Sequence, residues 1–132
     1  MKLIQVPITG GRLSGLTVPI NTACVSFIIA RTAQIKLIYL TNSPGDGLEM
    51  IPTSASDNAV NNALSTEPFI SFSATVVGDS LPENTVWVNK ACLVGIHDAT
   101  SKRRVYVWRA FDEQTIFETD ETAANIIALF NA

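Results

Sequence analysis

Few residues of this chain have types and neighbours that suggest catalysis, and the clearest are a histidine and the aspartate that follows it. His97 is the only histidine in 132 residues, and Asp98 stands next to it. An imidazole beside a carboxylate can act as a general base toward a serine such as Ser26 or Ser101. Neither serine lies in a nucleophile-elbow motif, and His97 falls where a predicted strand meets a polar hairpin tip. We therefore assign no catalytic residue and expect that the protein is not an enzyme.

Metal and cofactor sites are not predicted either. A structural zinc site needs several thiolates or imidazoles at compatible spacing, whereas Cys24 and Cys92 stand 68 positions apart (92 − 24). The loop Gly45-Asp46-Gly47 lacks the lysine and the hydroxyl residue of a phosphate-binding loop. We predict no metal ligand, no cofactor-binding residue and no cofactor.

A group of carboxylates near the end of the chain could in principle serve glycoside hydrolysis, which uses paired carboxylates. Asp120 and Glu121 are better explained by the start of a predicted helix, where the helix dipole favours negative charge. This group of carboxylates therefore does not change the expectation that the protein is not an enzyme. Its members are Asp112, Glu113, Glu118, Asp120 and Glu121.

The segment Lys102-Arg103-Arg104 is a candidate contact with a partner, because Tyr106 and Trp108 follow it closely. Basic residues beside aromatic residues on a β surface bind single-stranded nucleic acid in several barrels. The whole chain carries a net charge of −3, whereas a nucleic-acid-binding domain is expected to be basic. We therefore do not expect nucleic acid as the partner, and an acidic protein surface could meet the same residues.

The composition favours a protein that associates with other subunits. Hydrophobic residues make up 47% of the chain and charged residues only 16%, below the average of about 25% charged. Such a chain buries its apolar surface internally or against partners. The longest apolar run, Ala23–Ala30, is far shorter than the roughly 20 residues of a membrane span, so no membrane partner is predicted. Both cysteines lie in apolar runs, which predicts buried, reduced thiols and a reducing compartment.

The spacing of apolar residues predicts ten strands and two helices. One helix is expected at 54–64, with Ser54 as its N-cap, and the other at 119–130, with an apolar face that includes Ile126 and Phe130. The turn signal at 42–47 separates two strands of the first half. The predicted strands are Leu3–Ile8, Val18–Ile20, Ala23–Ile29, Gln34–Thr41, Leu48–Ile51, Phe69–Val76, Val86–Val88, Cys92–His97, Val105–Phe111 and Gln114–Glu118.

This order of elements occurs twice. Residues 17–25 and 85–93 are identical at five of nine positions, at an offset of 68 (85 − 17), and the helical segments 59–64 and 124–129 align at an offset of 65 (124 − 59). Collinearity favours an internal duplication into units 1–66 and 67–132. Units of this size are marginal alone, so we expect them to pack as one compact body. The predicted fold class is mainly β: two tandem, similar small β-sheet or barrel units, each ending in a short α-helix.

The alignment makes Trp87 a further candidate contact, together with Trp108. Trp87 stands where the first unit has Pro19, so the core common to both units does not require it. A large aromatic side chain at such a position could anchor a partner. It could equally fill a gap between the two halves.

The second half resembles small proteins encoded among bacteriophage virion genes. The resemblance rests on the extended segment Val86–Ile96, with its V-x-V-N start, on Val105–Trp108 and on the acid-capped terminal helix from Thr119 to Phe130. The first half departs from it, with Asn61-Asn62 in the helix where the second has Ile126-Ile127. The resemblance implies a virion component with a short β-barrel, such as a capsid decoration or cement protein that binds the major capsid protein.

Two functions are therefore expected from the sequence. The first is a non-enzymatic structural protein of a virion that forms homo-oligomers, binds the major capsid protein, or does both. The alternative is a small regulatory or nucleic-acid-binding β-barrel module. The two differ in charge, because the alternative requires a broad basic face and salt-dependent binding.

Overall fold

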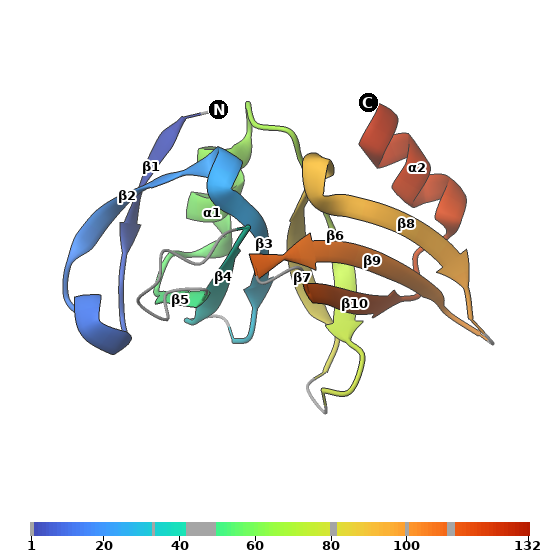
Figure 1. Cartoon of the computed structure of the whole chain (residues 1–132), viewed down its shortest axis with the longest axis horizontal. Coiled ribbons are helices and arrows are strands. Elements are labelled where there is room, and N and C mark those ends of the chain that lie inside the picture. The colour runs from blue at the N-terminus through green and yellow to red at the C-terminus, as the bar shows by residue number, and fades with distance from the viewer. Residues whose placement is uncertain (1, 33, 42–49, 80–81, 100, 111–112) are drawn as a thin grey trace.

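The computed structural model describes residues 2–32, 34–41, 50–79, 82–99, 101–110 and 113–132, and these form ten β-strands and two α-helices (Figure 1). The first half contains β1 (Leu3–Pro7), β2 (Thr17–Asn21), β3 (Val25–Ala30), β4 (Lys36–Leu40), β5 (Met50–Thr53) and helix α1 (Asp57–Leu64). The second half contains β6 (Phe69–Val76), β7 (Asn84–Asn89), β8 (Leu93–Asp98), β9 (Arg103–Arg109), β10 (Glu113–Thr119) and helix α2 (Ala123–Asn131). The prediction of a mainly β chain is confirmed.

The strands form two antiparallel sheets that do not close into a barrel. One sheet pairs β1 with β2, and the other has eight strands in the order β5-β4-β3-β7-β6-β10-β9-β8. A barrel in each half would need β3 to return to β2 and β8 to return to β7. Instead β3 pairs with β7, through Phe27↔Val88, Ile28↔Trp87 and Ile29↔Val86. The expectation of barrel units is therefore wrong, because the strand that could close the first unit joins it to the second.

The central pair of strands, β3 and β7, separates two hydrophobic cores. Successive side chains of a strand point to opposite faces, so Ile28 and Trp87 lie in the first core with α1. Phe27 and Val88 lie in the second core with α2. Each half thus contributes side chains to the core of the other.

The two halves also share the details of their strand pairing. β3 and β4 are interrupted by a bulge between Val25 and Phe27, and β8 and β9 by a bulge between Leu93 and Gly95, at an offset of 68 (93 − 25). Lys36 of β4 pairs with Thr53, and Arg103 of β9 pairs with Thr119. The isolated bridge Ile8↔Thr53 in the first half corresponds to the pairing of β6 with β10 in the second half, through Phe117↔Val76 and Glu118↔Thr75.

The helices begin later than the sequence pattern suggested. Ser56, not Ser54, caps α1 by accepting a 3.1 Å hydrogen bond from the amide of Ala59. Thr122 caps α2 in the same way, so the helices correspond at an offset of 66 (122 − 56) rather than 65. Asp120 and Glu121 precede α2 and lie outside its first turn, because the cap is the residue after them.

Candidate interaction surface

Trp87 lies between the two halves. Its side chain is 2% exposed, packs in the first core and donates a 2.8 Å hydrogen bond from Nε1 to Oδ1 of Asn61 on α1. Of the two interpretations left open by the sequence, this placement matches the one in which Trp87 fills a gap between the halves. In this structure it offers no surface to a partner.

The basic segment at the start of β9 is held by carboxyl groups. Lys102 Nζ lies 3.6 Å from Asp120 Oδ1, Arg103 Nη1 lies 3.7 Å from Asp98 Oδ1, and the side chain of Arg104 approaches Glu118. Arg103 also donates from Nε to the backbone carbonyl of Glu121, which fixes the approach to α2. All three candidates are partly exposed, but their charge is offset locally, so they do not form a broad basic face.

The outward face of β9 carries Arg104, Tyr106 and Trp108, because every second residue of a strand points to the same side. Val105 and Val107 between them are fully buried. The ring of His97 on β8 stacks against Tyr106 with centroids 5.3 Å apart, and Trp108 remains exposed. The structure therefore places Arg104 and Trp108 on the same outward face of β9, whereas Trp87 is buried in the first core.

In the part of the chain that the structure describes, no hydrogen bond joins His97 or Asp98 to Ser26 or Ser101. His97 is exposed and engaged with Tyr106. Ser26 is buried and donates from Oγ to the backbone carbonyl of Trp108. The hydroxyl of Ser26 thus holds β3 against β9 in a structural contact.

Exposed apolar side chains on β8 and on α2 were not identified from the sequence. Val94, at the bulge of β8, and Ile127, on α2, are about half exposed at 48% and 51%. Leu129 and Phe130 of the same helix are also exposed, and α2 lies beside β8 (Figure 1). The signal that could have revealed this surface is the helix composition, since AANIIALFN is apolar on more than the one face that a core needs.

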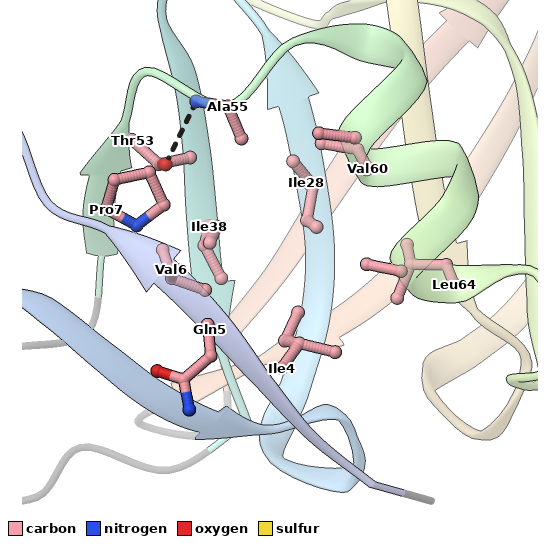
Figure 2. Close-up of a pocket in the computed structure, with 12 residues that line it drawn as sticks. Ile4, Gln5, Val6, Pro7, Ile28, Ile38, Thr53, Ala55, Val60 and Leu64 are labelled. Carbon is pink, nitrogen blue, oxygen red and sulfur yellow. Dashed lines mark hydrogen bonds between the residues drawn. The ribbon is translucent and has the colours of Figure 1, made fainter.

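A pocket of about 150 Å³ opens between β1 and α1 in the first core (Figure 2). It lies where the segment after β1 meets β5, which among the described residues are joined by the bridge Ile8↔Thr53 and by a backbone hydrogen bond from Thr9 to Pro52. Its walls are apolar, apart from Gln5 and Thr53 among the described lining residues, and Thr53 Oγ1 is engaged by the amide of Ala55. A ligand site normally combines apolar walls with several converging polar groups. The pocket is better explained as an incompletely filled part of the core.

The two cysteines correspond in position but differ in burial. Both are free thiols; Cys92 is buried, whereas Cys24 is exposed, so the prediction that both are buried is wrong for Cys24. Both cysteines end a 3-10 turn, Thr22–Cys24 and Lys90–Cys92. Cys92 follows β7, which is paired on both sides, and packs in the second core, whereas Cys24 follows β2, which among the described residues pairs with β1 alone. Burial raises the pKa of the Cys92 thiol above its ordinary value of 9.0, and a hydrogen bond with Ser26 opposes this effect.

No protein-family model, curated protein or solved structure matches the chain. Neither of the two described helices is long and apolar enough to cross a membrane.

Proposed function

We propose that this chain is a non-enzymatic structural protein that acts within a larger protein assembly. In the form suggested by the resemblance described above, it is a virion component such as a capsid decoration protein that binds the major capsid protein. Its working surface is the exposed apolar part of α2 together with the neighbouring edge strand β8. Trp108 lies on the other face of β9, away from the side chains that pack with α2, and would be a separate aromatic contact.

The observation that carries the proposal is the contrast between the two helices. α1 directs its apolar residues Val60 and Leu64 into the first core, where both are about 5% exposed. The corresponding residues of α2 are Ile126, which is buried, and Phe130, which is 37% exposed. Apolar residues exposed on the adjoining elements α2 and β8 favour a surface for a protein partner.

An origin by tandem duplication is part of the same proposal. It is supported by the shared element order, by the two bulges at equivalent positions and by the equivalent turn bonds of Asn21 and Asn89. Asn21 Oδ1 accepts from the amide of Ala23, and Asn89 Oδ1 accepts from the amide of Ala91, both at 2.9 Å. In a duplicated chain, one copy can keep the core while the other acquires contact residues.

The alternative function is a nucleic-acid-binding module that uses Arg104, Tyr106 and Trp108. The outward alternation of these residues favours it. The carboxylates Asp98, Glu118 and Asp120, which lie beside the basic residues, weigh against it.

The proposal is tested by the mass of the purified protein in solution. Light scattering after size exclusion, across a dilution series, should give masses above the 14.2 kDa of one chain. The matched variant is Ile127→Asn, which copies Asn61 of α1 and should shift the equilibrium toward the monomer. A mass of one chain at every concentration, for the protein and the variant alike, would contradict self-association and leave only binding to a different protein, such as the major capsid protein, or the alternative function.

The alternative function is tested separately. Binding of a fluorescent single-stranded oligonucleotide, weakened by salt and by Trp108→Ala, would favour the nucleic-acid-binding module instead.

A further inference from the structure

The joint between the two halves is formed by one strand of each half. In each half, the strand that corresponds to the partner's joint strand has an unpaired edge. β3 of the first half pairs with β7 of the second. Their equivalents are β8 and β2. Within the described residues, β8 pairs only with β9, and β2 pairs only with β1. The molecule therefore has two unpaired strand edges, β8 and β2, and these correspond to the two strands, β3 and β7, that pair at the internal joint.

The paired strands β3 and β7 and the unpaired strands β8 and β2 also differ in how far their residues are buried. β3 and the central residues of β7 are almost completely buried, whereas Val94, His97 and Asp98 of β8 and Thr17, Pro19 and Asn21 of β2 are exposed. β2 and β8 lie on opposite sides of the molecule (Figure 1). A chain with complementary edges on opposite sides can associate head to tail, and such a contact generates a closed ring or a filament.

We propose that β8 of one chain pairs with β2 of a second copy and so repeats the internal joint between β3 and β7. This inference rests on the proposed function and names the partner as another molecule of the same chain. The internal register, moved by the repeat offset of 68, gives the pairs Gly95 with Ile20, Ile96 with Pro19 and His97 with Val18 of the second copy. The added strand would satisfy backbone groups that an unpaired edge leaves open.

An asparagine supplies the clearest evidence for this register. Asn89 donates from Nδ2 to the backbone carbonyl of Val25, a buried 2.9 Å hydrogen bond that crosses the internal joint. Asn21 caps an identical turn but is exposed, and within the described residues its Nδ2 has no partner. In the repeated joint Asn21 of the second copy would donate to the carbonyl of Leu93, which corresponds to Val25.

Side chains around the edges fit the same arrangement. The internal joint places Trp87 against Asn61 of α1, and the repeated joint would place Pro19 of the second copy against Ile127 of α2. Cys92 is buried beside Ser26, so Cys24 of the second copy would become buried beside Val94. The contact would thus cover both Ile127 and Val94, which are exposed in the single chain.

Two departures from the internal joint make the repeated joint weaker. Phe27 inserts between Tyr39 and Phe117 in the second core, but its equivalent in β8 is Gly95. Trp87 has a backbone N–H, whereas Pro19 has none, and proline on an edge strand limits pairing. We expect reversible association between chains, in contrast to the permanent joint within each chain.

The register is tested by disulfide cross-linking in a Cys24→Ser background. The variant Val18→Cys/His97→Cys places two thiols directly opposite each other, within the Cα separation of about 4.4–6.8 Å that a disulfide requires. Mild oxidation should give covalent dimers and larger species. The matched control, Thr17→Cys/His97→Cys, moves one thiol to the other face of β2 and should cross-link at least about fivefold less.

Two further readouts use chains with few changes. In the unmodified protein, Cys24 should react with a thiol reagent more slowly as the concentration rises. Asn21→Ala should raise the dissociation constant about tenfold, as expected for a lost buried hydrogen bond of about 1.4 kcal/mol. Gly95→Phe, which has open space at its Cβ and restores the residue of β3, should lower the dissociation constant.

The outcomes separate this inference from the proposed function. Assembly by light scattering, with equal cross-linking of the two cysteine pairs or with dimers as the largest product, would overturn the head-to-tail joint and leave the structural function standing. A monomer at every concentration, with Cys24 labelled at a constant rate, would overturn the head-to-tail joint and the self-associating form of the proposed function, and would leave binding to a different protein standing.

Discussion

Asn21 and Asn89 make the same turn bond, but their surroundings differ. Asn89 is 4% exposed and ties β7 to β3 through the carbonyl of Val25. Asn21 is exposed on β2. Asn21 makes only the capping bond, whereas Asn89 also makes a buried bond between the two halves. Comparing substitutions of the two residues therefore gives the contribution of each bond to stability.

Asn89→Ala should lower the free energy of unfolding by about 2 kcal/mol, because the buried carbonyl of Val25 loses its partner. Asn21→Ala should cost about 1 kcal/mol, the typical value for a lost cap. Urea denaturation of dilute protein measures both. Equal losses would show that the bond across the joint adds nothing to the cap.

Cys92 should make stability depend on pH in alkaline solution. Burial raises the pKa of its thiol above 9.0 in the folded chain, so the unfolded chain releases this proton at lower pH than the folded chain does. The stabilisation is therefore complete below the unfolded pKa and is lost as the pH rises through the folded pKa.

The measurement is the urea midpoint between pH 8 and pH 10.5 for the protein and for Cys92→Ala. We expect a steeper decline in the protein that retains Cys92. Cys24→Ala, at the exposed equivalent position, should leave the slope unchanged. A slope unaffected by Cys92→Ala would mean that other groups cause the alkaline decline.

At the scale of elements, the strand pattern was largely predictable, because alternating apolar residues mark each half-buried strand. Phe69–Val76 matches β6 at both ends, and the other strands differ mainly at their ends. The end of the predicted strand at Phe111 and the turn at 42–47 lie outside the described residues. Capping was less predictable, since Ser54 and Ser56 both precede an apolar helical pattern and only backbone geometry selects Ser56.

The choice of cap gives a direct test. Ser56→Ala should lower the free energy of unfolding by about 1 kcal/mol, because the amide of Ala59 loses its acceptor. Ser54→Ala should have almost no effect, as Ser54 lies outside α1. Thermal or urea unfolding followed by far-ultraviolet circular dichroism compares the two. A larger loss for Ser54→Ala would place the start of α1 two residues earlier.

The candidate surface was only partly predictable from the sequence. Trp108 and Arg104 fall on the outward face of β9, which follows from strand alternation. The burial of Trp87 depends on the pairing of β3 with β7, a contact between residues 59 positions apart (87 − 28), and local patterns do not determine such pairs. The exposure of Ile127 and Phe130 likewise depends on how much of α2 the second core covers.

At the scale of the whole molecule, the two cores depend on each other. Phe27 of the first half packs between Tyr39 and Phe117 in the second core, and Trp87 of the second half packs in the first core. Side chains exchanged in this way couple the two halves. We expect one cooperative unfolding transition instead of two.

Phe27→Ala tests this coupling. Removal of a fully buried phenylalanine should cost about 3–5 kcal/mol, and tryptophan fluorescence and circular dichroism should shift together. Leu3→Ala, at a position that is 65% exposed, is the control and should change little. Separate transitions for the two signals in Phe27→Ala would indicate that the halves unfold independently.

The pairing of β3 with β7 also determines when the first half can complete its folding during synthesis. A ribosome releases the chain from its N-terminus at about 5–20 residues per second, so the first half emerges complete but without Trp87. Until β7 has left the exit tunnel, β3 presents an open strand edge beside an unfinished core, the kind of surface on which nascent chains aggregate. Slow codons that are read before β7 has left the tunnel would prolong this exposure, and slow codons that are read later would not. We therefore expect the solubility of the newly made protein to depend on where translation pauses, with chaperone demand concentrated in the interval before β7 is released.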